Sequence, residues 1–496
     1  MQRPLRDACP QGEDTLSVGT TADRQKQLSL AAILAFAGTS LPVAALAIAI
    51  SVQLPPYFAG HLGISLAVVG NAFAIVRLID IPLDPFIGLA MDRTRTPIGR
   101  YRAWMLAGAP ILMGGLFMLF HAPVGATIVY LITWLLIMYL GLSILTLSHS
   151  AWAANLATSY QERSRIFGVL AAVGVAGALM ALVIPIVMSS MGKSNAEGVM
   201  AMGWAIIALI PIAVGAVVLS TKEKITRDHA EGHFQLKDYV ALLTQGNVVR
   251  ILLADLCVTL GPGWMAAIYI FFFTASRGFS VTDANALLAV YILAGFVGAP
   301  ATAWLANKIS KHRALMLTTT LYSVGLITLM AVPQGSVLIG LIPMALLGAF
   351  ASGFGVMIRA LTADIGDEIR LEGGKEQIGL LYALTNATTK VAGAGSIFLT
   401  FNVLAAIGFN AKEGAINTAE QIRGLELAYL IGPIFFVMLG GACFWGYKLD
   451  SKRHAEIRSQ LEERDALYDE TASLEGLTGQ ADAVYVGDDR KPTVSE

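Results

Sequence analysis

Charged residues and cysteines are both scarce in this chain. Only 14% of its 496 residues are charged and 55% are hydrophobic, whereas a soluble domain carries about 25% charged residues. The three cysteines form no CxxC pair or Cys/His cluster, which argues against a disulfide scaffold or a structural zinc site. The net charge is −1 and no basic patch carries interleaved aromatics, so nucleic acid is not an expected partner. These absences leave an integral membrane protein as the expected class.

Long apolar stretches recur along nearly the whole chain. A bilayer core about 30 Å thick is crossed by ~20 helical residues at 1.5 Å each. Backbone groups in lipid must bond within the segment itself, which excludes isolated strands. We therefore expect an all-α membrane protein with twelve transmembrane helices. The expected spans are 28–53, 65–90, 103–122, 125–157, 163–190, 198–221, 248–275, 280–306, 313–333, 335–363, 376–407 and 424–448.

The distribution of basic residues sets the expected orientation. Lys and Arg favour cytoplasmic loops, and all but eight of the 34 lie in the two tails and the even-numbered loops. Both termini are therefore expected in the cytoplasm. The longest polar interruption divides the spans six and six. The expected units are a cytoplasmic N-terminal tail at 1–27, a six-helix bundle at 28–221, a central cytoplasmic loop at 222–247, a second six-helix bundle at 248–448 and a cytoplasmic C-terminal tail at 449–496.

Two further helices are expected outside the membrane, at 234–243 in the central loop and at 448–467 in the C-terminal tail, where the helix would be solvated. We expect the acidic remainder of that tail to be disordered. A weak repeat relates the bundles, because Gly88-Leu-Ala-Met-Asp-Arg93 after the second span resembles Trp304-Leu-Ala-Asn-Lys308 after the eighth. Two similar halves in parallel orientation suit a transporter that rocks about a central site.

The densest group of charges within a predicted span lies at Arg77-Leu-Ile-Asp80-Ile-Pro-Leu-Asp84-Pro85. Asp80 and Asp84 are four residues apart and share one helix face, which Arg77 also occupies. Two neighbouring carboxylates in low dielectric favour a bound proton or cation, and the prolines leave upstream carbonyls without helical partners. Since ionisable groups within a membrane usually serve function, we predict a cation or proton site. The alternative is a static Arg–Asp pair that fixes helix packing.

Lys390 is the second informative charge. It lies near the middle of the span expected at 376–407, where an unpaired lysine would be costly. The small residues of Val391-Ala-Gly-Ala-Gly395 permit another helix to approach closely. We therefore expect Lys390 to contact Asp80 and Asp84. The alternative is that its side chain snorkels to the membrane interface.

Other polar and aromatic residues within the spans are open to two interpretations. His149 can shuttle a proton and Trp152 can stack on a ring-bearing solute, but either residue can equally serve in packing. In the seventh span, Gly261-Pro-Gly-Trp264 is expected to interrupt the helix, and broken helices often line transport sites. Asp255 in the same span suits such a site and the membrane interface equally well.

Charged residues at the cytoplasmic ends of the spans are expected mainly to set the topology. Some of them are expected to form a gate, because exposed ion pairs are weak enough to open. The candidate gate residues are Asp92, Arg93, Arg100, Arg102 and Arg163.

One composite pattern runs from Arg77 to Trp104. It consists of an arginine, two aspartates four apart, a proline and a glycine, then a basic Gly-Arg loop and a tryptophan. With this pattern the chain resembles the glycoside–pentoside–hexuronide:cation symporters, the melibiose-permease-like branch of the major facilitator superfamily. Supporting stretches are Gln161-Glu-Arg163, the segment from Ala363 to Asp367, and Thr389-Lys390. The resemblance covers residues 28–448 and implies the major facilitator fold, two six-helix bundles around a central cavity.

The same resemblance implies symport driven by sodium or protons. By position, Asp80 and Asp84 match the family's cation-site aspartates, and Lys390 matches the lysine that contacts them. Arg77 is expected to be a further charge partner. The sodium-using members carry asparagine where this chain has Leu83, a departure that favours protons.

Further departures concern the solute. The family's sugar-binding aspartates align with Ala44 and Thr146, and its arginine aligns with Leu170 or Ala171. A hydroxyl-rich sugar needs polar partners to replace its water, so these losses suggest a less polar solute or a different sugar pose. The candidate solute contacts are Gln53, Ser148, His149, Trp152, Trp264 and Asn386.

We therefore expect a secondary transporter that couples a sodium ion or proton to a small organic solute, a sugar or glycoside, by alternating access. A distant branch of the family carries lysolipids, so an amphipathic solute stays open. A non-transporting solute sensor with the C-terminal tail as its output is a rival of another class. No catalytic His/Glu/Asp pattern or nucleophile motif supports an enzyme. The sequence indicates no cofactor and no protein partner, only the solute and the bilayer of a bacterial-type inner membrane.

Overall fold

The computed structural model of the protein describes residues 29–156, 160–221, 223, 241–373, 377–464 and 466. All regular elements in these residues are helices. Twelve helical stretches among them are long and apolar enough to cross a membrane, so the predicted all-α membrane fold with twelve spans is confirmed. The predicted N-terminal tail, most of the central loop and the end of the C-terminal tail lie outside the described residues.

The first six spans are built from ten helical elements. The first span combines five of them: α1 (Leu30–Ala37), α2 (Ser40–Ile48), η1 (Ala49–Gln53), α3 (Leu54–Pro56) and η2 (Tyr57–His61). The other spans are single helices: α4 (Leu66–Arg93), α5 (Arg100–Phe120), α6 (Ile128–Leu156), α7 (Tyr160–Ser190) and α8 (Asn195–Ser220).

The last six spans are longer on average than the first six, and three of the described helices begin with a capping box. The spans are α10 (Gly246–Phe271) continued by η3 (Phe272–Ser276), α11 (Val281–Ile309), α12 (Lys311–Met330), α13 (Val337–Gly373), α14 (Ile378–Ile407) and α15 (Ala419–Ala442). Ser194, Ser280 and Thr418 each cap a helix reciprocally with the residue three positions later. These caps satisfy backbone donors that the first helical turn leaves free.

The first span extends beyond its predicted end at residue 53. The helical path continues to His61, although Pro55 and Pro56 interrupt it. Both prolines lie in the first turn of the short α3, where a missing N–H costs no helical hydrogen bond. The π-helical turns η1 and η2 lie on either side of α3 and take up the change in helical register. The prolines therefore divide the span without ending it.

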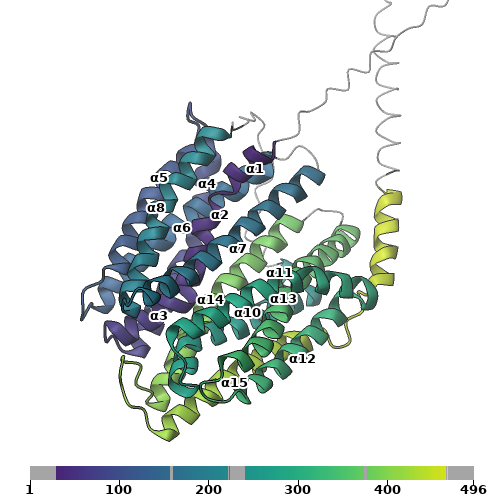
Figure 1. Ribbon diagram of the computed structural model, residues 1–496. Helices are drawn as coiled ribbons and strands as arrows, with labels where there is room; N and C mark the ends of the chain where they lie inside the picture. The colour runs from purple at the N-terminus through teal and green to yellow at the C-terminus, as the bar shows by residue number, and fades with distance from the viewer. Residues whose placement is uncertain are drawn as a thin grey trace, which may run out of the picture.

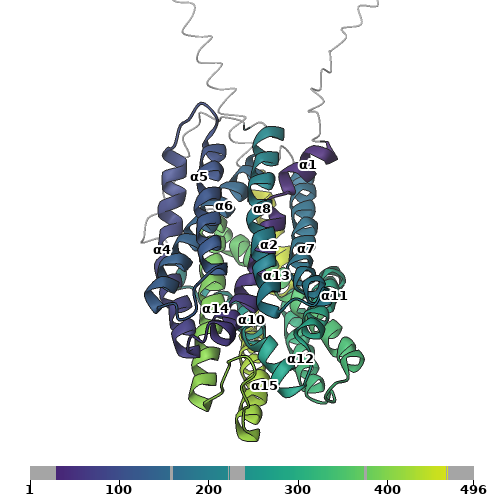
Figure 2. The ribbon, with the colours of Figure 1, turned by 60° about the vertical axis from the view of Figure 1, so that its left-hand side comes forward.

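The spans pack into two bundles of six, coloured purple to teal and teal-green to yellow in Figure 1. In the first bundle α5 packs on α6 and α2 on α7; in the second α11 packs on α13 and α10 on α14 and α15. Figure 2 shows the helices of both bundles running in roughly one direction. Between the bundles, α4 packs on α14 and α7 on α11. These pairs are spans two with eleven and five with eight, so the interface repeats when each span is replaced by its counterpart.

The predicted break at residues 261–264 is absent. Helix α10 runs continuously from Gly246 to Phe271 with its proline inside. A Cβ on Gly261 would meet Val437 of α15 at 2.4 Å, and a Cβ on Gly263 would meet Ser396 of α14 at 2.8 Å. The two glycines therefore allow close packing of three helices, which explains them better than an interruption of the helix does.

The beginning of the C-terminal tail is docked and not solvated as predicted. Residues 451–464 form a helix in which Ile457 and Leu461 are only 1% and 2% exposed. His454 lies 3.3 Å from Asp364 and 3.1 Å from Asp367 on α13. Helix α13 extends to residue 373, ten residues past the predicted limit, and this extension supplies the docking surface.

A capping residue begins this C-terminal helix. The Asp450 carboxylate accepts hydrogen bonds from the backbone N–H groups of Arg453 at 2.9 Å and Lys452 at 3.1 Å. These bonds stabilise the charged form, so the pKa of the Asp450 carboxyl is lowered from its ordinary value. The helix has a defined start and a buried face, and is therefore part of the folded second bundle.

Replacing Ile457 and Leu461 by alanine should release the C-terminal helix from α13. Burial of such side chains contributes roughly 1.5–3 kcal/mol each, so we expect faster tryptic cleavage after Arg453 in detergent-solubilised protein. Glu456→Ala is the matched control, because its side chain on the same helix is 61% exposed. Equal cleavage rates for the double variant and the control would contradict the docking.

Candidate functional site

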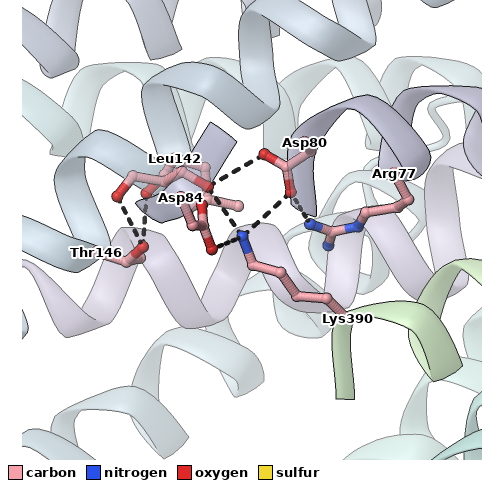
Figure 3. A network of polar contacts seen from close by, with 7 residues as sticks. Arg77, Asp80, Asp84, Leu142, Thr146 and Lys390 are labelled. Atoms are coloured by element: carbon pink, nitrogen blue, oxygen red, sulfur yellow. Dashed lines mark hydrogen bonds and ion pairs between the residues drawn. The ribbon is translucent and has the colours of Figure 1, made fainter. Parts of the chain in front are cut away.

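Four charged side chains meet between the two bundles (Figure 3). Arg77, Asp80 and Asp84 come from α4 of the first bundle, where a spacing of three and four residues puts them on one face. Lys390 comes from α14 of the second bundle, which packs along α4. The structure thus brings together the four residues that the sequence singled out for their charge.

Lys390 bridges the two aspartates. Its Nζ donates a hydrogen bond to Oδ2 of Asp80 at 3.2 Å and another to Oδ2 of Asp84. Arg77 donates from Nη1 to the same oxygen of Asp80 at 2.7 Å. Asp80 therefore has one cation from each bundle, whereas the ion pair of Asp84 is with the lysine of the other bundle.

Two residues of α6 complete the site, and neither was predicted from the sequence. Ser143 donates to Oδ1 of Asp80 at 3.2 Å and accepts from Lys390 Nζ at 3.2 Å, so the three donors of the ammonium group are all used. The Arg77 guanidinium lies over the ring of Tyr139, 3.9 Å from its centroid. Serine and tyrosine are common in apolar helices, so the sequence carried no signal for Ser143 and Tyr139. Their role becomes visible only because α6 packs on α4.

The site is balanced in charge but not in hydrogen bonds. It contains two positive and two negative side chains, and the side chains of Asp80, Asp84 and Lys390 are 1%, 23% and 25% exposed. Within the described part of the chain, the buried Oδ1 atom of Asp84 has no hydrogen-bond partner. A carboxylate oxygen that is free of partners, next to a partly accessible lysine, can accept a proton or a cation.

Leu83 and Thr146, where the sequence departs from the family it resembles, add no ligand to Asp84. Leu83 packs in an apolar cluster that includes Ile87 and Ile144. Thr146 donates its hydroxyl to the carbonyl of Leu142 in its own helix at 2.8 Å (Figure 3). A hard cation that is bound through oxygen would find few ligands here beyond the carboxylates and Ser143.

The candidate solute contacts on α6 are packed inside the first bundle. The His149 ring stacks on Phe36 with centroids 4.5 Å apart, and its Nε2 lies 2.9 Å from the Phe36 carbonyl oxygen. Trp152 is 1% exposed and meets the same phenyl ring edge-on. Ser148 is fully buried and donates to the Ile144 carbonyl. His149 and Trp152 thus pack α6 against α1, whereas Ser148 bonds within its own helix; their role as solute contacts stays a prediction.

The other candidate solute contacts lie on three different spans. Gln53 is 3% exposed and donates to Asn285 of α11 at 2.8 Å. Trp264 is 7% exposed and donates to the carbonyl of Ala428 at 2.9 Å. Asn386 is exposed on α14, one turn before Lys390, and shares its helix face. Their role as solute contacts stays a prediction.

The candidate gate residues that the structure describes make contacts within the first bundle. The backbone N–H groups of Arg100 and Arg102 donate to the Glu223 carboxylate at 2.8 Å and 3.2 Å, which caps the N-terminus of α5. The Arg102 guanidinium donates to the carbonyl of Thr221. Arg93 is exposed. These contacts tie the central loop to α5; the side chains of Asp92 and Arg163 lie outside the described residues.

Asp255 is buried, at 6% exposure. Its Oδ2 accepts hydrogen bonds from Thr388 at 2.5 Å and Thr389 at 3.0 Å. Both hydroxyls belong to α14, immediately before Lys390. The second bundle therefore holds the backbone of this lysine firmly while its side chain reaches the first bundle.

Known sequences resemble this chain along almost its whole length. The family model described as MFS/sugar transport protein matches residues 35–451. The chain is 25% identical to the symporter YnaJ of Bacillus subtilis (strain 168), over 84% of this chain and 92% of that protein. It is 23% identical to the isoprimeverose transporter of Lactiplantibacillus pentosus, over 85% and 90%. It is also 23% identical to the glucuronide carrier protein homolog of Escherichia coli (strain K12), over 82% and 90%.

Solved transporter structures share the arrangement of the helices. The nucleoside transporter NupG superposes with a TM-score of 0.63 at 12% identity, covering 85% of this chain and all of that one. A bacterial homolog to the human lysosomal transporter Spinster, inward-facing and unoccupied, superposes with a TM-score of 0.59 at 12% identity, covering 87% and 97%. At such identities the likeness shows the fold alone.

Replacing Lys390 by methionine should destabilise the protein, because Asp80 and Asp84 would share a single remaining cation. Loss of such a charged partner costs about 1–3 kcal/mol, which should lower the midpoint of thermal unfolding, followed by tryptophan fluorescence in detergent. Asp84→Asn removes part of the repulsion, so the double variant should be at least as stable as Lys390→Met alone. Lys452→Met on the exposed side of the C-terminal helix is the control. Destabilisations that simply add in the double variant would argue against a direct bond.

Proposed function

The chain belongs to the MFS/sugar transport protein family of the major facilitator superfamily, and on this premise we propose that it is a proton- or sodium-coupled symporter of a sugar or glycoside. In this proposal Asp80 and Asp84 bind the coupling ion, and Lys390 and Arg77 are their charge partners. The observation that carries the proposal is the bridge from Lys390 of one bundle to both aspartates of the other.

Ion binding would upset the charge balance of this bridge. With two positive and two negative side chains present, a bound proton or cation leaves one excess positive charge, which is unfavourable in a low-dielectric site. Lys390 is then displaced from the aspartates. Because the lysine and the aspartates belong to different bundles, its displacement loosens the contact of α14 with α4. The ion therefore has different affinities for the two conformations, as coupling requires.

The surroundings of Asp84 favour a proton over sodium. A proton needs only one carboxylate oxygen, and Oδ1 of Asp84 is buried without a partner among the described residues. Sodium needs several oxygen ligands, whereas Leu83 turns an apolar side chain into a hydrophobic cluster. The Thr146 hydroxyl is already engaged by a helix carbonyl.

The relatives favour a sugar or glycoside as the solute, since two of them are named for isoprimeverose and for a glucuronide. Solute-stimulated ion flux in proteoliposomes tests this, with sodium and pH varied separately. We expect isoprimeverose or methyl glucuronide to drive proton uptake without sodium. Lysophosphatidylcholine, as the probe of an amphipathic solute, should not. Binding of a sugar without counterflow would favour the solute sensor and contradict the symporter.

Asp84→Asn should abolish concentrative uptake, lowering gradient-driven accumulation more than tenfold. A neutral amide resembles the ion-bound carboxyl but cannot release an ion, so exchange of labelled for unlabelled solute at equal concentrations should persist. Uptake and exchange are measured in the same proteoliposomes. Glu420→Gln, an exposed change in the first turn of α15, is the control. Undiminished accumulation by Asp84→Asn would remove the assignment of the coupling-ion site.

A further inference from the structure

Several contacts among the described residues join the two bundles at the ends opposite to the predicted cytoplasmic side, here called the outer ends. Each pairs a residue of the first bundle with one of the second. They include the pairs Gln53 with Asn285 at 2.8 Å, Ser189 with Thr282 at 2.9 Å, Asn71 with Asn402 at 3.2 Å, His61 with Glu413 at 3.6 Å, and the Gly60 carbonyl oxygen with the Glu413 N–H at 3.3 Å. These residues lie in the outer parts of the spans or in the loops that connect them. The outer ends are therefore in contact in this structure.

Of these contacts between side chains, the one between Gln53 and Asn285 is buried. The two residues are 3% and 0% exposed, whereas Ser189 and Thr282 pair at the surface. Water competes strongly with an exposed hydrogen bond and much less with a buried amide pair. One such bond typically shifts an equilibrium about two- to tenfold. It is strong enough to bias the outer ends towards closure and weak enough to break in every cycle.

The side-chain amide of Asn285 also has an unused hydrogen-bond donor. Among the described residues its buried Nδ2 has no partner, which is unfavourable until water or a solute supplies an acceptor. This unused donor makes the closed arrangement less stable than a fully paired one. The pair is thus suited to open when a hydrogen-bonding molecule arrives.

A cavity lies beside the amide pair at the outer ends. Its volume is about 310 Å³, and Gln53 forms part of its wall together with Tyr57, Phe271, Thr274 and Asn410. Aromatic rings beside amide and hydroxyl groups suit a molecule with a hydroxylated ring. Such a solute meets the Gln53 side chain on entry and can replace Asn285 as its hydrogen-bond partner.

We propose that Gln53 and Asn285 form an outer latch, which a hydroxyl-bearing solute arriving from outside releases. This inference rests on the proposed transport function, in which the bundles rock against each other. With the latch closed, the site around Lys390 is shut off from the outside. When a solute hydroxyl takes over the Gln53 amide, the bundles separate and water reaches both amides.

Ala49 provides a reporter for this opening, because it is fully buried on η1, one turn inward of Gln53. In a chain with its three native cysteines replaced by serine, Ala49→Cys should react with a membrane-impermeant maleimide only when the outer ends part. We expect Gln53→Ala and Asn285→Ala each to raise the labelling rate about two- to tenfold. The double variant should be no faster than the faster single variant. Ser189→Ala, which removes the exposed contact, should change the rate less than twofold.

Unchanged labelling in both single variants, or effects that multiply in the double variant, would overturn the latch. A Gln53→Cys/Asn285→Cys chain gives a second test if a variant folds poorly. Oxidation to the disulfide should block isoprimeverose uptake and reduction should restore it, whereas uptake that survives complete cross-linking rejects the latch. Labelling needs no coupling ion, so the two proposals fail separately. Unchanged labelling together with ion-driven uptake would reject the latch alone.

Discussion

The rest of the structure depends on the contact between Lys390 and the two aspartates of α4. Charged side chains are costly within a membrane unless they are paired, and neither bundle balances its own charges at this site: α4 contributes Arg77, Asp80 and Asp84, and α14 contributes Lys390. Pairing them requires α14 to lie along α4. Through the internal repeat, the same geometry places α7 against α11. The need to pair Lys390 with the aspartates thus accounts for the contact of α4 with α14, and the symmetry of the repeat accounts for the contact of α7 with α11.

The sequence predicted those parts of the fold and site that can be recognised from one segment alone, without knowing which residues pack against it. Apolar stretches of about 20 residues exist only to cross a bilayer, so the twelve spans followed from length alone. Arg77, Asp80, Asp84 and Lys390 stood out because each is unfavourable in lipid. Ser143 and Tyr139, which touch these charges, did not stand out because neither residue type is costly within an apolar helix. Only the packing of α6 on α4 gives them a role.

The wrong predictions share one physical cause, since each assumed that a local preference would act alone. Gly261 and Gly263 were expected to interrupt α10, yet they remain helical because α14 and α15 approach where a Cβ would collide. The C-terminal helix was expected in water because it is highly charged, yet Ile457 and Leu461 recur at a spacing of four and bury one face. Tertiary neighbours overrode propensity in each case.

Two weak contacts at different depths serve coupling better than one strong contact would. On the proposed mechanism the ion displaces Lys390 near the middle of the interface, and the solute displaces Asn285 from Gln53 at the outer ends. Either event alone leaves the other contact in place. The population of the conformation in which the bundles have moved then rises only by the factor contributed by the one broken contact. When both ligands are bound the two factors multiply. Movement of the bundles then requires ion and solute together, which suppresses a leak of either ligand alone. Neither contact has to be so strong that it could not break in each cycle.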